Sequence, residues 1–273
     1  MRSPAGRPRD DAEGAGGAQR VALAPGRWVC LRALRGHDEE SVAGRGTLAA
    51  VQLLDRLLVD GPGTCAPPEG AAALSVTDRD LLLAAVYRAA YGPRVDATVH
   101  CTSCAAPFDV DFDLDALVAD VLSDRPPPDD GLYTLPGGRR FRLPTAEDEF
   151  AVLGLEPEAA ERALLARCLL TEGDPGGSDD ATLAAAVARA APALDVDLPA
   201  TCPECGGAQT LRFQLQDYLL GAIAKDGERR LHEIHLLAQS YAWGLDEILS
   251  LSRQRRRGFA ALCAGESPPR GLP

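Results

Sequence analysis

The sequence contains no run of about 18 apolar residues, so it predicts no membrane-spanning helix. The first 20 residues are rich in glycine, arginine, aspartate and alanine. They include no apolar segment of the kind that a secretory signal needs. Both absences favour a soluble protein of the cytoplasm. Thiols stay reduced there, so paired cysteines indicate metal or redox sites before disulfides.

Sequence signatures of catalysis are also missing. The chain has no Gly-x-x-x-x-Gly-Lys-Ser/Thr phosphate-binding loop, no Gly-x-Ser-x-Gly motif and only 4 histidines. The segment His232-Glu233-Ile234-His235 is one residue shorter than the His-Glu-x-x-His motif of zinc proteases, and no third ligand accompanies it. We therefore expect a protein that is not an enzyme.

Acidic residues outnumber basic ones by 40 to 28, which gives a formal net charge of -12. A surface of this charge repels phosphate backbones and anionic lipids, so neither nucleic acid nor a membrane is an expected partner. One local basic cluster is interpreted as a solvated helix face that complements the helix dipole or meets an acidic partner. Its members are Arg253, Arg255, Arg256 and Arg257.

Hydrophobic residues make up 46% of the 273 residues, enough for a sizeable core. Residues 27–265 are predicted to form a single α+β domain. Within it, residues 145–192 are a helical insertion and residues 216–265 a C-terminal helical part. Residues 1–26 are predicted to be a disordered tail, and residues 266–273 a second tail, because glycine, proline and charge dominate there.

Two helix starts are indicated by polar residues that precede apolar runs. Thr77 or Asp78 is the predicted N-cap of a helix that ends at Gly92-Pro93. Thr145 is the predicted N-cap of a second helix, with Asp148 at its third position as in a capping box.

Two segments alternate apolar and polar residues around a Cys-x-x-Cys turn. They span residues 94–114 and 194–215, and each is predicted to be a strand, a turn and a second strand. At a shift of 101 positions both cysteines and the apolar face of the following strand coincide. Chance is a poor explanation for this combination, so we infer an internal repeat.

The four cysteines of these turns are predicted to hold one structural Zn²⁺ ion. Two thiolates separated by two residues can point at one metal, and two such knuckles complete a tetrahedral shell with no open position. The expected fold is therefore a zinc-ribbon-like β core from two knuckle hairpins, with the helical insertion and the C-terminal helices around it. The predicted ligands are Cys101, Cys104, Cys202 and Cys205.

Other interpretations of the cysteines stay open. A redox Cys-x-x-Cys motif needs a helix that starts at the motif, whereas alternating strands follow both turns. Two separate disulfides, or unligated thiols, are further possibilities. A zinc ribbon combined with the basic cluster would suit a nucleic-acid-binding regulator, which is the alternative function.

The order of motifs resembles the T-even-type phage baseplate protein family, whose relatives also occur in contractile injection system loci. The matching pieces lie between residues 77 and 263 and are DRDLLLAAVYRAAYGPRVDATVHCTSCAAPFDVDFDL, RFRLPTAEDE, LLARCLL, CPECGGAQTLRFQLQDYL and RRLHEIHLLAQSYAWGLDEILSLSRQRRRGFAALC. The resemblance implies a non-enzymatic baseplate component or assembly chaperone for the baseplate hub. The implied partners are hub or wedge proteins of a contractile tail-like particle, into which the protein is itself built if it is a component. The resemblance carries over the four knuckle cysteines and no catalytic residue.

Overall fold

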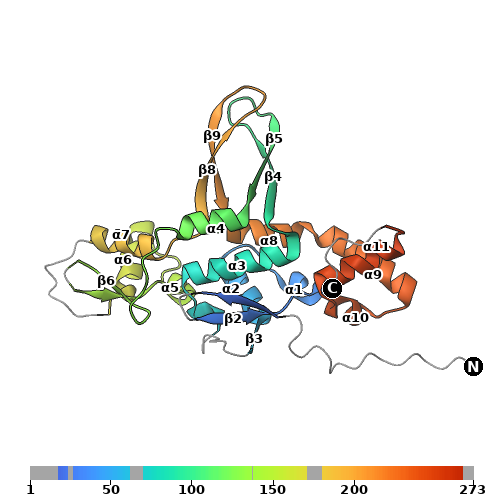
Figure 1. The fold of residues 1–273 in the computed structure, drawn as a ribbon, viewed down its shortest axis with the longest axis horizontal. Helices are drawn as coiled ribbons and strands as arrows, with labels where there is room; N and C mark the ends of the chain where they lie inside the picture. The colour runs from blue at the N-terminus through green and yellow to red at the C-terminus, as the bar shows by residue number, and fades with distance from the viewer. Residues whose placement is uncertain (1–17, 24–26, 62–69, 137, 171–179, 267–273) are drawn as a thin grey trace, which may run out of the picture.

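The computed structural model describes residues 18–23, 27–61, 70–136, 138–170 and 180–266. These residues form an elongated body from which two β-hairpins project on the same side (Figure 1). Helices and small antiparallel sheets are combined in one chain, so the predicted α+β class is confirmed. In this part of the chain, no helix is both long and apolar enough to cross a membrane.

The centre of the body consists of three helices above a small sheet (Figure 1). The helices are α2 (Thr47–Leu57), α3 (Val76–Tyr91) and α8 (Leu215–Lys225). The sheet is antiparallel with the order β1-β2-β3. Its strands are β1 (Gln19–Ala22), β2 (Trp28–Leu31) and β3 (Leu58–Val59), and the single-turn 3₁₀ helix η1 (Ala71–Ala73) precedes α3.

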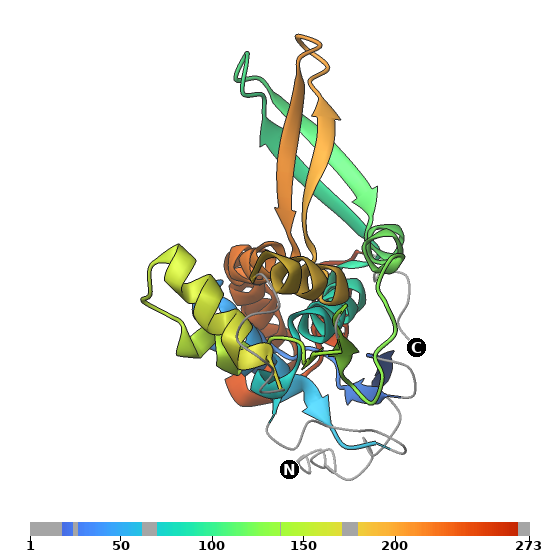
Figure 2. The ribbon, with the colours of Figure 1, turned by 90° about the vertical axis from the view of Figure 1, so that its left-hand side faces the viewer.

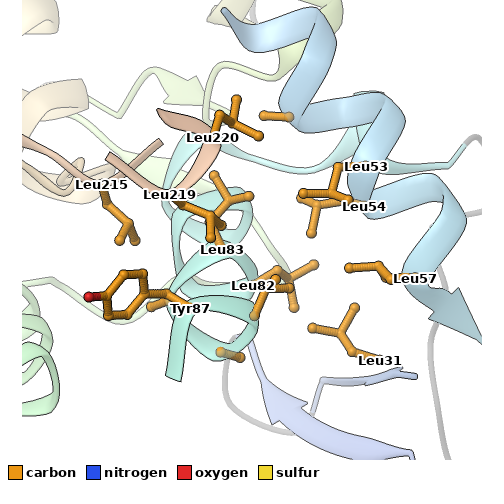
Figure 3. Close-up of a cluster of buried hydrophobic side chains, with 14 of the residues drawn as sticks. Leu31, Leu53, Leu54, Leu57, Leu82, Leu83, Tyr87, Leu215, Leu219 and Leu220 are labelled. Carbon is orange, nitrogen blue, oxygen red and sulfur yellow. The ribbon is translucent and has the colours of Figure 1, made fainter. Parts of the chain in front are cut away.

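Leucines of the three central helices form the middle of the main buried cluster (Figure 3). On α2 the buried positions recur three or four residues apart, which is the spacing of one helix face. Burial of each such side chain contributes roughly 2 kcal/mol to the free energy of unfolding. The leucines are Leu53, Leu54 and Leu57 on α2, Leu82 and Leu83 on α3, and Leu215, Leu219 and Leu220 on α8.

A second buried cluster lies at one end of the body, at the left of Figure 1. In it the short strands β6 (Tyr133–Thr134) and β7 (Arg140–Phe141) pair antiparallel, and their aromatic rings stack with centroids 5.5 Å apart. The helices that follow lie within residues 145–192, where the sequence predicts helices. They are α5 (Ala146–Ala151), α6 (Pro157–Cys168) and α7 (Asp180–Ala190), of which α6 and α7 complete the cluster.

The two projecting hairpins have strands of equal length and stand beside each other in both views (Figure 1, Figure 2). The first pairs β4 (Arg94–His100) with β5 (Pro107–Asp113), and the second pairs β8 (Asp195–Thr201) with β9 (Ala208–Gln214). A helix follows each hairpin at once, α4 (Leu114–Leu122) after the first and α8 after the second. The repeat found in the sequence therefore continues into a helix.

This arrangement differs from the expected β core. Each hairpin is a separate two-stranded sheet, and the main buried cluster is formed chiefly by helices. The physical reason is that a two-stranded hairpin with one apolar face has too little area to enclose a core. The cysteine-bearing turns lie at the far ends of the hairpins, outside the main cluster (Figure 2).

The C-terminal helices lie at the opposite end of the body from the second cluster (Figure 1). They are α9 (Gly227–Tyr241), α10 (Leu245–Ser250) and α11 (Arg253–Cys263), and α1 (Gly36–Ser41) packs against α10.

The basic cluster on α11 is mostly inside the structure. Arg256 is 1% exposed and donates to Glu233 (2.9 Å) and to Glu39 (2.5 Å). Arg253 is 4% exposed and is hydrogen-bonded to Glu39 and Asp226. The interpretation as a solvated helix face is therefore wrong for these two arginines. Their burial requires carboxylates from distant segments, which the local sequence does not indicate.

Two local predictions about helix starts had different outcomes. The N-cap of α3 is Ser75, not Thr77 or Asp78, because the Ser75 Oγ accepts the Asp78 N–H (3.1 Å). At α5 the predicted capping box is confirmed, since Asp148 accepts the Thr145 N–H (3.0 Å).

Part of the predicted N-terminal tail is a strand. Residues 19–22 form β1 and pair with β2 in antiparallel register, with Leu23 buried directly after them. Pairing with a neighbouring strand outweighs the polar composition of the segment. Residues 1–17, 24–26 and 267–273 of the predicted tails lie outside the described residues.

Removal of one buried leucine tests the main cluster. Leu83 on α3 is fully buried, so Leu83→Ala should lower the free energy of unfolding by about 2–5 kcal/mol. Leu231→Ala on α9 is the matched control, because Leu231 is 65% exposed and its loss should cost less than about 0.5 kcal/mol. Urea unfolding of both variants measures the difference, and equal losses would contradict the assignment of the core.

Candidate metal centre

The β4–β5 hairpin ends in a tight turn that carries Cys101 and Cys104. The Cys101 N–H donates to the Ala106 carbonyl (2.9 Å), and the Ala105 N–H donates to the Cys101 carbonyl (2.9 Å). Ala105, directly after the second cysteine, has a φ of 59°. This left-handed residue turns the chain back, so that both cysteine side chains lie on the inside of the turn.

The β8–β9 hairpin repeats this turn around Cys202 and Cys205. The Cys202 N–H donates to the Gly207 carbonyl (3.0 Å), and the Gly206 N–H donates to the Cys202 carbonyl (2.9 Å). Gly206 takes the left-handed conformation with a φ of 70°, which costs a glycine little. The repeat in the sequence is thus also a repeat of backbone hydrogen bonds.

The two turns bring the four predicted ligands together. The Sγ atoms of Cys101 and Cys205 are 3.7 Å apart, those of Cys104 and Cys202 are 3.8 Å apart, and all four lie within 4.8 Å of one another. These distances are far longer than the roughly 2.05 Å of a disulfide bond, and all four are free thiols. The four cysteines can therefore hold one metal ion.

The sulfur positions also show an approximate twofold symmetry. At the shift of 101 positions Cys101 corresponds to Cys202, and Cys104 corresponds to Cys205. A rotation that exchanges the two hairpins therefore places the Cys101–Cys205 pair on the Cys202–Cys104 pair. The duplicated halves contribute equally to the centre.

The first and second cysteine of each turn differ in environment. Cys101 and Cys202 are buried beside Phe108, whereas Cys104 and Cys205 are exposed at the tip. The backbone N–H groups of Cys104 and Ser103 are hydrogen-bonded to the Cys101 sulfur and lower the pKa of that thiol to about 6. The turn thus favours the thiolate form of Cys101, the form that binds metals, whereas the neighbouring cysteine sulfurs raise the pKa of Cys104.

A side chain that the sequence did not single out links the two turns. Gln209 on β9 accepts the backbone N–H of Thr102 through its Oε1 (2.9 Å). It is the glutamine of GGAQTL, a few residues beyond Cys205, and no sequence pattern marks such a contact across two hairpins.

Two tyrosines of the body hold the base of the first hairpin. The Tyr87 hydroxyl donates to the Arg94 carbonyl (3.2 Å), and the Tyr218 hydroxyl donates to the Asp96 carbonyl (2.5 Å). Between the hairpins, Phe112 of β5 meets the ring of Phe213 of β9 edge-on, with centroids 4.9 Å apart. The metal centre therefore lies at the end of two strand pairs that are fixed at their base.

A buried carboxyl group on α3 fixes the start of the second hairpin. The Asp80 Oδ2 accepts the Leu194 N–H (2.8 Å) one residue before β8. Burial raises the pKa of Asp80 to about 6, although the bond from Leu194 acts in the opposite direction. The hairpin is thus anchored by a group that titrates in a mildly acidic range.

The other candidate ligands from the sequence lie apart from this centre. His232 and His235 are exposed on α9, while Glu233 between them is buried against Arg256. His100 is exposed next to Cys101. Of the remaining cysteines, Cys30, Cys168 and Cys263 are single free thiols, and Cys65 lies outside the described residues.

Comparisons of the chain with protein-family models, with curated proteins and with solved structures find no match. The resemblance to the baseplate family stays a prediction from the sequence motifs.

The variant Asp80→Asn tests the buried anchor. A free aspartate ionises near pH 4, so between about pH 4 and 6 the folded chain keeps a proton that the unfolded chain releases. The contribution of this carboxyl to the free energy of unfolding therefore falls as the pH rises. An asparagine can still accept the Leu194 N–H but does not titrate. Between pH 4 and 7 the free energy of unfolding of the variant should rise relative to that of wild type by on the order of 2 kcal/mol.

Urea unfolding at several pH values measures this gain. Asp96→Asn is the control, since the Asp96 side chain is exposed and its replacement should leave the pH dependence unchanged. Parallel curves for Asp80→Asn and wild type would show that Asp80 does not titrate in this range.

Loss of one cysteine tests the metal centre. Purified wild type and Cys263→Ser should each carry one metal ion per chain, and Cys202→Ser should lose it, because Cys263 lies on α11 outside the group of four. Elemental analysis of the purified proteins gives the ratio.

Chelation of the metal should speed amide hydrogen exchange in the β4–β5 and β8–β9 hairpins. Exchange in α3 should not change, because α3 is held by the main cluster. Equal metal content in Cys202→Ser and wild type would contradict the ligand assignment.

Proposed function

We propose that the four cysteines hold one structural zinc ion. Zinc binds thiolates at about 2.3 Å, and a tetrahedron of that size has edges of about 3.8 Å. The sulfur pairs at 3.7 and 3.8 Å fit this size. Four thiolates fill the coordination shell and leave no place for water or substrate, which supports a structural role.

Local structure favours this interpretation of the cysteines over a redox role. In each turn a strand follows the second cysteine, whereas a thioredoxin-like motif places its first cysteine at the start of a helix. Cys101 and Cys104 also contact cysteines of the other hairpin, which suits shared ligation of one ion.

We further propose that the chain is a non-enzymatic structural or assembly protein, chaperone-like in its action, of a contractile phage-tail-like baseplate. The pair of hairpins carries this proposal. They stand clear of the body (Figure 2), and their ends bring four cysteines within reach of one metal ion. Such a pair offers a long surface to another protein. The order of motifs adds the class of partner, baseplate hub or wedge proteins.

The nucleic-acid alternative has less support. It relies on a basic face around the arginines of α11, but Arg253 and Arg256 are buried against carboxylates. The hairpins themselves expose several aspartates, among them Asp96, Asp109 and Asp197, which repel a phosphate backbone.

Affinity capture of the tagged full chain from cells that produce the tail-like particle tests the proposal. Mass spectrometry of the eluate should identify hub or wedge proteins. A Cys104→Ser/Cys205→Ser variant should lose them, because separated hairpin ends no longer present one surface. The variant Cys263→Ser is the matched control and should retain them.

Presence of the chain in purified particles would indicate a component, and absence a chaperone. Capture of nucleic acid or of a thiol-linked partner in place of tail proteins would refute the proposal.

A further inference from the structure

A second internal repeat, at a shift of 110 positions, surrounds the short helices α1 and α5. In each copy an arginine precedes the helix and an Asp-Glu pair lies in its first turn. The matching positions are Arg32, Leu34, Arg35, Asp38 and Glu39, which we name socket 1, and Arg142, Pro144, Thr145, Asp148 and Glu149, which we name socket 2.

The two sockets are built by the same internal bonds. Arg32 forms a bidentate ion pair with Asp38 (2.6 and 2.8 Å), and Arg142 forms one with Asp148 (2.5 and 2.9 Å). In each socket the same aspartate also accepts the backbone N–H of the N-cap residue, which is Arg35 in socket 1 (2.9 Å) and Thr145 in socket 2 (3.0 Å). Each aspartate is buried, and together these bonds fix the backbone of the socket.

Each socket holds a segment with the pattern Leu-Ser-x-x-x-Arg from elsewhere in the chain. Residues 74–79, which we name strap 1, lie in socket 2, and residues 251–256, named strap 2, lie in socket 1. In both straps the serine caps a helix, α3 or α11, by accepting the N–H three residues later.

The straps make the same contacts with their sockets. The residue after each strap serine donates its N–H to a socket carbonyl, Val76 to Pro144 (3.2 Å) and Arg253 to Leu34 (2.8 Å). The serines pair with the socket as isolated β-bridges, which are Ser75 with Thr145 and Ser252 with Arg35.

An ion pair completes each contact. Arg79 of strap 1 donates to Glu149 (2.9 Å), and Arg256 of strap 2 donates to Glu39 (2.5 Å). Strap and socket are far apart in the sequence in both cases. The same set of bonds therefore occurs twice, each time between two segments that are distant along the chain.

The two straps differ in how firmly the rest of the fold holds them. Strap 1 leads into α3 at the centre of the main buried cluster. Strap 2 belongs to the C-terminal lobe, residues 227–263, which follows α8 after the single residue Asp226. Among the described residues, the main buried cluster contains none from this lobe. The lobe is attached instead through α1, which packs against α10, and through Arg253, which lies over the ring of Tyr91 at the edge of the cluster (4.4 Å).

The contact between strap 2 and socket 1 depends on charge, and it leaves a pocket beside the strap. Glu39 is the partner of two buried arginines of the lobe, Arg253 and Arg256. A pocket of about 210 Å³ lies between strap 2 and the body, with Ser252 and Arg253 on one side and Leu31 on the other. Buried ion pairs are costly to desolvate and contribute less net stability than apolar packing.

We propose that socket 1 is a peptide-binding site that accepts strap 2 of a second copy of the chain, so that two copies exchange their C-terminal lobes. The ligand class is a helix start with the pattern Leu-Ser-x-x-x-Arg, which the second copy supplies by its own sequence. Exchange of an identical element is a low-cost route to a dimer, because every contact of the closed chain is kept.

Complementary charge reversals test this exchange. Glu39→Arg and Arg256→Glu each place like charges in socket 1 of a chain closed on itself. In an exchanged pair of the two variants, one socket has the unaltered ion pair and the other has the reversed pair, while the neighbouring Arg253 and Glu233 are unchanged in both. A mixture of the full-length variants should therefore contain a 1:1 complex of twice the 28.7 kDa mass of the chain. Native mass spectrometry and light scattering measure it.

The matched control uses the other socket. A mixture of Glu149→Arg and Arg79→Glu should give no complex, since strap 1 cannot leave without α3. The double variant Glu39→Arg/Arg256→Glu should regain the closed chain, with a melting temperature above that of either single variant. A complex in the control mixture, or only single chains in the test mixture while circular dichroism shows both variants folded, would overturn the proposal.

If either single variant is unfolded, the wild-type chain decides. Two differently tagged wild-type copies, incubated together at high concentration, should form mixed dimers whose share rises with concentration. A wild-type chain that keeps a mass of 28.7 kDa at every concentration would then overturn it.

Discussion

Two-stranded hairpins are marginally stable in water, because each buries only one face and has no further strand beside it. The β4–β5 and β8–β9 hairpins are separate two-stranded sheets that reach the main buried cluster only near their bases, through residues such as Val95 and Phe213. They are fixed at both ends, at the base by Tyr87, Tyr218 and Asp80, and at the tip by the four cysteines. Between the ends, apolar side chains are mostly half-buried between the two sheets. The position of the four cysteines therefore depends on the contacts at the base of the hairpins.

Duplication explains how two marginally stable hairpins can be joined at their ends by only four cysteines. A hairpin alone supplies two thiolates, which is half of a tetrahedral shell. A second copy at a shift of 101 positions supplies the other half, and the sulfur contacts are related by exchange of the copies. The sockets repeat at 110 positions, so the segment between socket and hairpin differs in length between the halves. The difference falls between socket and hairpin, so it leaves the register of the hairpin strands unchanged.

The sequence predicted those parts of the fold whose signals are local. Alternation of apolar and polar residues located both hairpins, and the Cys-x-x-Cys turns located the ligands that the structure brings together. It did not predict features that arise from contacts between distant segments. The burial of Arg256 depends on Glu39, and the capping of α3 by Ser75 accompanies pairing with Thr145. The same holds for the place of the cysteines, because a pattern of strands does not reveal whether a hairpin lies in a core or projects from it.

The separation of the cysteine turns along the chain has a topological consequence. With an ion held by the four thiolates, the segment from Cys104 to Cys202 becomes a closed loop that includes α4 and the whole second cluster. One broken peptide bond within that loop leaves two fragments that stay joined through coordination bonds. The loop is therefore a suitable place to divide the protein into two separately expressed fragments, because each fragment contributes two of the four cysteines.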